Sequence, residues 1–348
     1  MNDYRKKIII TGGSSGIGKA AAMELAKEHV EIVLTGSHTL KGEKAVSDIK
    51  KATGNEFVSF MSCDLSSFKY VKSFVTRIKS KWDQLDVLVN NAGVVKKDRQ
   101  LTDNGFEYTF QVNYLSHYLL TLSLLGMLKK SKDGRIINVS SRMEKFSQLN
   151  LNDVNLEKKY NPVVAYANSK QAQLLFTYAM AEKYPELSVN ALHPGGVFTG
   201  LYNYSPIVNI LSYLYRPFMI SPKKGAETLV YLATADDVKG ISGKYFIKNK
   251  ESKSSPHSYN KEQIKALWEM SNKAVGLQKE TIKKRQNAVK SKKELNPKIE
   301  QSSKKELNPK KEPNSKKATT SKPKSSKTTK TAQDKTKKKE DIKPNKQA

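Results

Sequence analysis

The sequence predicts an α/β protein with a doubly wound parallel sheet that helices cover on both faces. Two observations predict it. Short apolar or β-branched runs alternate with longer amphipathic runs as far as Ile247, and a glycine-rich turn follows the first run directly. Strand–helix–strand units of this kind make right-handed crossovers, so the strands should run parallel.

The expected strands are short runs rich in Ile, Val and Leu, beginning with Ile8–Ile10. They are residues 7–10, 31–35, 57–62, 85–89, 135–139, 188–192 and 244–247. The expected helices have apolar residues at helical spacing. They are residues 19–28, 40–53, 66–81, 104–130, 165–183 and 259–277. Within the fourth helix the run 115–128 is the most apolar, but Ser116, His117, Thr121 and Ser123 interrupt it. This run therefore predicts a buried helix. It is too short and too often interrupted to supply the ~18 apolar residues that a membrane-spanning helix needs.

Charge divides the chain into two parts. Lys and Arg number 62 against 33 Asp and Glu, a formal net charge of +29. The last 70 residues hold 24 of the basic and 8 of the acidic residues and no aromatic residue, and the eight letters from Ser291 recur from Ser303. Such a segment buries too little apolar surface to offset its ordering entropy. We expect a single folded domain over residues 1–278 and a disordered lysine-rich tail over residues 279–348.

Several protein classes are excluded. Cys63 is the single cysteine, so the chain cannot close an intramolecular disulfide, and no Cys/His cluster suggests a metal site. The N-terminus has too few apolar residues before Thr11 for a signal peptide. We expect a cytoplasmic protein, and the sequence leaves peripheral membrane contact and nuclear entry open.

The glycine-rich turn at residues 11–18 reads T-G-G-S-S-G-I-G. Glycines at 12, 16 and 18 suit a tight turn, approach of the backbone to a pyrophosphate and close helix–strand packing. The following helix supplies free amides and the positive end of its dipole. A glycine-rich turn alone is weak evidence, and the alternative is an ordinary strand–helix turn. Its position between a strand and a helix favours a Rossmann dinucleotide site.

Other motifs fall at the ends of later strands. Asn90–Gly93 reads N-N-A-G, Ser140 and Ser141 end the fifth strand, and Tyr166 and Lys170 lie one helical turn apart. With Asn113 in the fourth helix and the turn Pro194-Gly195, these segments resemble the short-chain dehydrogenase/reductase family. Its signature combines TGxxxGxG, NNAG, Asn, Ser, YxxxK and a PG turn. Further segments resemble its retinol dehydrogenase branch, and this similarity covers about residues 4–277. Among them are Asn155–Tyr160, Ser221–Ala226, Ser242–Phe246 and Leu267–Leu277.

The resemblance implies a site on this chain. The catalytic residues would be Asn113, Ser141, Tyr166 and Lys170. The cofactor contacts would be Gly12, Ser14, Ser15, Gly16, Ile17, Gly18, Ser37, Asp64, Leu65, Asn91, Ala92, Gly93, Tyr166, Lys170, Pro194, Gly195, Val197 and Thr199. A free tyrosine has a pKa near 10, and a neighbouring ammonium favours the phenolate. Tyr166 could then exchange a proton with a substrate oxygen, while the family assigns Ser141 to orient that oxygen, Lys170 to the nicotinamide ribose and Asn113 to a relay water.

Four further residues have competing interpretations. In the family the position of Asp64 bonds the adenine amino group, although Asp is also a preferred helix N-cap. His193 is interpreted as a family-typical turn position rather than an acid or base. His117 is interpreted as a core histidine, and Cys63 as a small apolar residue.

Cofactor choice depends on the end of the second strand. A site specific for NAD places a carboxylate there, for the ribose 2′-hydroxyl. Here the residues are Gly36, Ser37 and His38, with Lys41 nearby, so NADP is favoured over NAD. The arginine that usually selects NADP in the family is absent at Ser37.

The substrate is expected to be a small lipophilic alcohol or carbonyl compound, because residues 201–220 are rich in Tyr, Leu and Ile and follow the PG turn. Plain packing of that segment is the alternative. A different class of function is a non-catalytic nucleotide sensor, or an adaptor whose basic tail contacts an anionic membrane surface or polyanion nonspecifically. The tail lacks the aromatic and arginine residues of a specific nucleic-acid reader.

Overall fold

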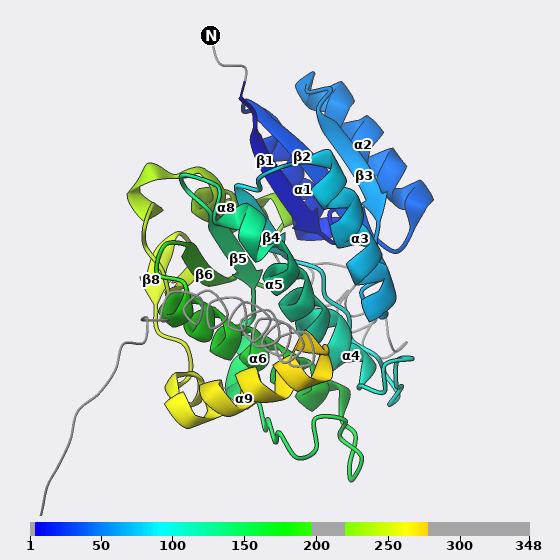
Figure 1. Cartoon of the computed structure of the whole chain (residues 1–348), viewed down its shortest axis with the longest axis vertical. Coiled ribbons are helices and arrows are strands. Elements are labelled where there is room, and N and C mark those ends of the chain that lie inside the picture. Colours follow the sequence, from blue (N-terminus) through cyan, green and yellow to red (C-terminus); the bar gives the residue numbers. More distant parts are fainter. Residues whose placement is uncertain (1–3, 197–219, 278–348) are drawn as a thin grey trace, which may run out of the picture. The chain divides into compact units, whose positions relative to one another are not determined.

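The computed structural model describes residues 4–196 and 220–277 (Figure 1). Its centre is an eight-stranded sheet of order β3-β2-β1-β4-β5-β6-β7-β8. The strands are β1 Lys6–Thr11, β2 Val30–Gly36, β3 Val58–Ser62, β4 Val87–Asn90, β5 Arg135–Val139, β6 Ser188–His193, β7 Tyr245–Ile247 and β8 Lys250–Ser252. The pairs from β3 to β7 in this order are parallel, and β8 pairs antiparallel with β7.

The principal helices follow the strands in alternation. They are α1 Gly16–Leu25, α2 Thr39–Thr53, α3 Phe68–Lys81, α4 Tyr108–Phe110, α5 Ser116–Leu128, α6 Pro162–Lys183, α8 Pro222–Thr234 and α9 Lys261–Ala274. A π-helical segment, η1 Gln111–Leu115, joins α4 to α5, and a 3₁₀ turn, η2 Arg142–Phe146, follows β5. No helix of residues 4–196 and 220–277 is both long and apolar enough to cross a membrane.

The structure confirms the doubly wound parallel sheet and its seven predicted strands. It corrects the prediction in three places. The expected helix 104–130 is divided into α4, η1 and α5. Strand β8 was missed because its three residues, K-E-S, have no apolar pattern; a two-residue turn with positive φ at Lys248 and Asn249 sets its pairing. Helix α8 was also missed, although Ser221 caps it and Pro222 begins it. The predicted tail lies outside the described residues.

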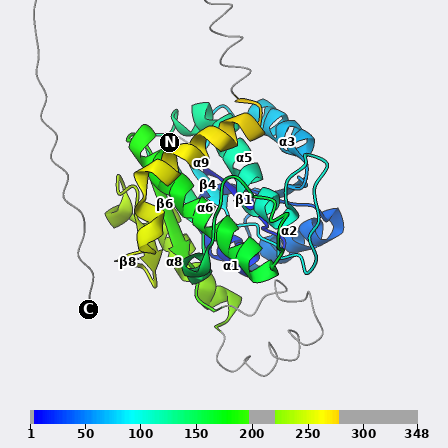
Figure 2. The same cartoon turned by 90° about the horizontal axis from the view of Figure 1, so that it is seen from below.

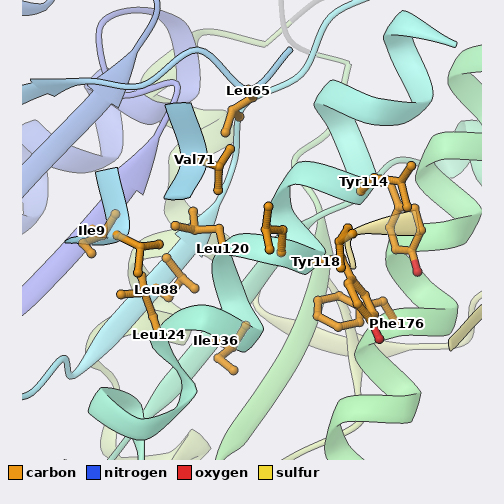
Figure 3. Packing of buried hydrophobic residues seen from close by; sticks show 14 of the residues in the cluster. Ile9, Leu65, Val71, Leu88, Tyr114, Tyr118, Leu120, Leu124, Ile136 and Phe176 are labelled. Atoms are coloured by element: carbon orange, nitrogen blue, oxygen red, sulfur yellow. The ribbon is translucent and has the colours of Figure 1, made fainter. Parts of the chain in front are cut away.

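Two apolar cores cover the two faces of the sheet. Because side chains alternate along a strand, Ile8 and Ile10 face one core and Ile9 faces the other. The first core lies beneath α1, α2 and α8, and the second beneath α3, α5, α6 and α9. In the second core Tyr118 of α5 packs on Phe176 of α6, with ring centroids 5.0 Å apart (Figure 3). Helix α9, yellow in Figures 1 and 2, runs alongside α6 and closes this core.

A buried hydroxyl joins the ends of β1 and β4. Thr11 Oγ1 accepts the backbone N–H groups of Asn91 (2.9 Å) and Ala92 (3.0 Å) and lies 2.8 Å from His117 Nε2. His117 Nδ1 lies 2.8 Å from the carbonyl oxygen of Asn113, which can only accept, so Nδ1 carries the ring proton. Thr11 therefore donates its hydrogen to Nε2. The bond from Thr11 needs the neutral ring, because a protonated Nε2 could not accept it.

The environment of His117 makes it a stability determinant at acid pH. Burial lowers the pKa of His117 from 6.5 to about 4. Between these values the unfolded chain binds a proton that the folded chain does not. The free energy of unfolding should therefore fall as pH is lowered from 6.5 towards 4, by up to about 3 kcal/mol from this group.

We predict that His117→Gln flattens the pH dependence of urea unfolding between pH 6.5 and 4.5. His257→Gln, at an exposed histidine, serves as the control and should keep the wild-type slope. A His117→Gln slope equal to that of the wild type would contradict the assignment.

Candidate active site

A cavity of about 590 Å³ lies at the edge of the sheet where the parallel strands end. The loops after β1, β2, β3, β4, β5 and β6 all contribute to its lining. Parallel strands bring their carboxyl ends to one edge, and open α/β sheets bind ligands there. The predicted motifs, far apart in sequence, therefore meet in one place.

The glycine-rich loop forms one wall of this cavity and packs tightly on the loop after β4. A Cβ atom at Gly18 would lie 2.5 Å from the carbonyl oxygen of Gly12, so no larger residue fits without a shift. Gly12 has φ +65°, and its Cβ would meet the Cα of Ala92 at 2.9 Å. The Asn91 side chain completes the junction by donating to the carbonyl oxygen of Thr11 at 2.8 Å. This packing exposes the first turn of α1 to the cavity, where Gly16 and Ile17 line it.

Asn113 lies beside the cavity rather than in its wall. Its Oδ1 accepts the N–H of Val94 at 2.8 Å, and its Nδ2 donates to the carbonyl oxygen of Val94 and to Ser169 Oγ, each at 3.0 Å. The side chain thus fixes the loop that follows Gly93. The residue lies in the π-helical turn η1, a feature often found at functional sites.

Ser141, Tyr166 and Lys170 line the cavity together. Ser141 lies two residues after the end of β5 and caps η2, where its Oγ accepts the N–H of Met143 at 3.2 Å. Tyr166 and Lys170 face the cavity from α6, and the Lys170 Nζ atom lies 5.5 Å from the centroid of the Tyr166 ring. Ser140 ties the strand to this helix by donating to the carbonyl oxygen of Lys170 at 2.9 Å.

The Lys170 ammonium group is buried. It donates to the carbonyl oxygen of Val139 at 2.8 Å and to Gln173 Oε1 at 2.9 Å. Burial lowers the pKa of Lys170 from 10.5 to about 7. The two acceptors favour the charged form and oppose this shift, so the local contacts determine how much ammonium is present near neutral pH.

The other end of the cavity lies beyond β2 and β3. Ser37, His38 and Lys41 line it at the start of α2, with Asp64 and Leu65 from the loop after β3. Ser37 Oγ lies 2.9 Å from His38 Nδ1. No carboxylate follows β2 among these lining residues.

For Asp64 the sequence allows either an adenine contact or a helix cap. The capping interpretation is wrong, because α3 begins at Phe68, after Ser67. The Asp64 carboxylate instead accepts the N–H of Ser66 at 2.9 Å and lines the cavity.

Most of the predicted site residues line the cavity: Gly12, Ser14, Ser15, Gly16, Ile17, Ser37, Asp64, Leu65, Asn91, Ala92, Gly93, Ser141, Tyr166, Lys170, Pro194 and Gly195. Gly18 and Asn113 do not line it, because they pack beneath its wall. Val197, Thr199 and all but the last residue of the apolar segment 201–220 lie outside the described residues.

Sequence reasoning missed some lining residues. Val94, Val95 and Lys96 directly follow the N-N-A-G motif, so their position was a usable signal. No sequence signal pointed to Tyr108, because it reaches the cavity from α4. The Nζ atom of Lys96 lies 4.2 Å from the centroid of the Tyr108 ring.

Unlike His38, the histidines at 117 and 193 do not line the cavity. His117 is buried and bonds Thr11 and the backbone of Asn113. His193 Nδ1 accepts the N–H of Arg142 at 3.3 Å, and burial lowers the pKa of His193 to about 4. Both side chains are thus used within the fold.

Comparison with known proteins agrees with the motifs. Residues 6–206 match the family described as short chain dehydrogenase. Retinol dehydrogenase 12 of Mus musculus is 37% identical over 275 residues, which cover 78% of this chain and 87% of the relative. Retinol dehydrogenase 13 of Homo sapiens is 36% identical (80% and 87% covered), and polyprenol dehydrogenase of Homo sapiens is also 36% identical (77% and 84% covered).

A solved structure gives the same result for the fold. A protein of Mycobacterium Paratuberculosis described as uncharacterized is 26% identical, with a TM-score of 0.63, over 78% of this chain and 93% of that one. The family match spans more than half of the chain and the relatives exceed 30% identity over most of it. The chain therefore belongs to the short-chain dehydrogenase/reductase family of oxidoreductases.

Proposed function

We propose that the protein is an NADP(H)-dependent oxidoreductase that interconverts a lipophilic alcohol and its carbonyl compound. One observation carries the proposal: Ser141, Tyr166 and Lys170 line the same cavity as the glycine-rich loop. A site that only bound a nucleotide would not need a hydroxyl, a phenol and an ammonium together at the end opposite Ser37.

The residues fit a bound dinucleotide. Gly12 and Gly18 let the loop pack closely on neighbouring backbone, and this packing leaves the first turn of α1 facing the cavity. The first turn of α1 offers backbone amides and its positive dipole end to a pyrophosphate. When bound, the nicotinamide supplies or accepts the hydride.

The protein's own groups would handle the proton and the substrate oxygen. The Ser141 hydroxyl hydrogen has no acceptor among the described residues and is available to orient that oxygen. The Tyr166 hydroxyl would donate its proton to the oxygen during reduction and remove it during oxidation. The ammonium of Lys170 would stabilise the phenolate electrostatically and donate to the ribose.

The substrate assignment comes from the relatives. Their names specify retinol and polyprenol, which are both long apolar alcohols with a terminal hydroxyl group. Valines 94, 95 and 112 and Tyr108 line the cavity and offer apolar surface to such a substrate. We therefore propose a long-chain apolar alcohol or aldehyde of this kind.

The preference for NADP rests on charge at the end of β2. Ser37, His38 and Lys41 line the cavity there, and a carboxylate that would repel a 2′-phosphate is absent from these lining residues. The alternative function, a non-catalytic protein acting through its basic tail, has no support from the comparisons.

We predict that Tyr166→Phe binds NADPH nearly as well as the wild type while turnover falls ~10²-fold or more, because the proton donor is lost. Tyr178→Phe is the matched control on the same helix; its hydroxyl bonds Ser254 and does not line the cavity. Turnover of Tyr166→Phe above a third of the wild-type value would rule out the role.

A second prediction tests cofactor choice. The wild type should have a higher kcat/KM with NADPH than with NADH, and Ser37→Asp should shift the ratio towards NADH by repelling the 2′-phosphate. Ser37→Asn has a similar size without the charge and should keep the preference for NADPH. A wild type that prefers NADH, or an equal shift in both variants, would contradict the proposal.

A further inference from the structure

The polar partners of Lys170 come from two elements. Val139 at the end of β5 contributes its carbonyl oxygen, and Gln173 of α6 contributes its side-chain oxygen, 2.8 and 2.9 Å from Nζ. An ammonium has three N–H donors. Two are directed into the protein, so one remains for the cavity that Lys170 lines. A Cβ atom on Gly93 would lie 3.7 Å from Nζ, so the ammonium sits against this glycine.

Gln173 is itself held firmly. The residue is 1% exposed, and its backbone carbonyl oxygen accepts the hydroxyl of Thr177 at 2.7 Å. Thr177 in turn accepts from Asn138 Nδ2 at 2.9 Å, and Asn138 Oδ1 accepts from Asn90 Nδ2 at 2.8 Å. A chain of buried hydrogen bonds thus connects the backbone of Gln173 to β5 and β4.

The two ends of the Gln173 amide differ. Its oxygen bonds Lys170, whereas its Nε2 is buried and has no hydrogen-bond partner among the residues described. A buried donor without a partner costs free energy. Leucine would avoid that cost at similar size, so packing alone does not account for a glutamine here. The contact that distinguishes glutamine from leucine is the one to Lys170.

We propose that Gln173 is a positioning residue: its amide oxygen holds the Lys170 ammonium so that the remaining N–H is presented to the ribose of the cofactor. This inference rests on the proposed function. Lys170 touches the cofactor in that account, and Gln173 acts only through Lys170.

Few other ionisable groups act on Lys170. Tyr166 faces it from the same helix, and His117 of α5 interacts with it electrostatically. The pKa of His117 is about 4, so this ring is neutral above pH 6. Val139 and Ser140 of β5 and Gly93 of the loop after β4 do not titrate. Around Lys170, the groups to consider between pH 6.5 and 9.5 are thus Lys170 and Tyr166. His38 and Lys41 line the other end of the cavity and are the same in every variant compared.

The test is the pH dependence of the NADPH dissociation constant, measured by fluorescence titration of the full-length protein. In the wild type, binding should weaken as Lys170 loses its proton. Gln173→Leu removes an acceptor from the ammonium, so the weakening should begin at least one pH unit lower, and binding at pH 7.5 should be ~10-fold weaker. Gln173→Glu keeps the acceptor and adds a negative charge that favours the ammonium, so the weakening of NADPH binding should begin at least one pH unit higher. The same variants are then compared in a Tyr166→Phe background. No phenol can ionise at position 166 there, so any remaining shift belongs to Lys170.

Gln171→Leu is the matched control. Gln171 is equally buried on α6, and its side chain reaches Gln263 of α9 rather than Lys170. This variant should keep the wild-type affinity for NADPH and the wild-type midpoint, which is the pH at which half of the weakening has occurred. An equal shift in Gln171→Leu would assign the effect to helix packing and overturn the inference.

Lys170→Met separates the two proposals. If it weakens NADPH binding while both Gln173 variants keep the wild-type midpoint, the positioning role is wrong and the proposed function stands. If the wild type does not bind NADPH at any pH, both are wrong. Opposite shifts in Gln173→Leu and Gln173→Glu would establish the role, and either shift alone suffices where the other variant does not fold.

Discussion

The parallel pairing of β1 with β4 is the constraint on which the site depends. It brings the glycine-rich loop against the Asn91–Gly93 loop, and the Thr11 hydroxyl fixes the two by accepting both amides of the second loop. His117 then ties Thr11 to the backbone of Asn113. One buried hydroxyl and one neutral imidazole thus hold together the glycine-rich loop, the Asn91–Gly93 loop and Asn113, which span about a hundred residues of sequence. A misplaced Thr11 would disturb both ends of the cavity together, the one lined by Ser37 and the one lined by Tyr166.

Because the cavity lies over the ends of β4 and β5, polar side chains from these strands and from α6 are buried beneath it. Asn90, Asn138 and Thr177 link β4, β5 and α6, and Lys170 is desolvated beside them. Burying such groups is unfavourable unless each finds a partner. The second apolar core, in which Tyr118 and Phe176 pack between α5 and α6, keeps these helices fixed on the sheet (Figure 3). Rigid placement lets short hydrogen bonds offset the desolvation.

Much of the fold and site could be predicted because the informative residues are contiguous. The loop 11–18, the N-N-A-G segment and the Tyr166–Lys170 pair each carry their geometry locally, and the parallel direction of the strands follows from the alternation of elements. What could not be predicted depends on contacts between distant segments. Tyr108, Gln173 and the tautomer of His117 acquire their roles only when helices pack on strand ends. Strand β8 depends on a two-residue turn, and its own residues carry no pattern.

The central claim is that hydride moves between a nicotinamide and a carbonyl carbon in this cavity. The most direct measurement uses NADPH with deuterium at nicotinamide C4 and a long-chain apolar aldehyde such as retinal, with mass spectrometry of the product. The account predicts an alcohol that carries one deuterium on its former carbonyl carbon, and loss of this product in Tyr166→Phe. Bound NADPH without any labelled alcohol across a panel of apolar aldehydes and ketones would contradict it.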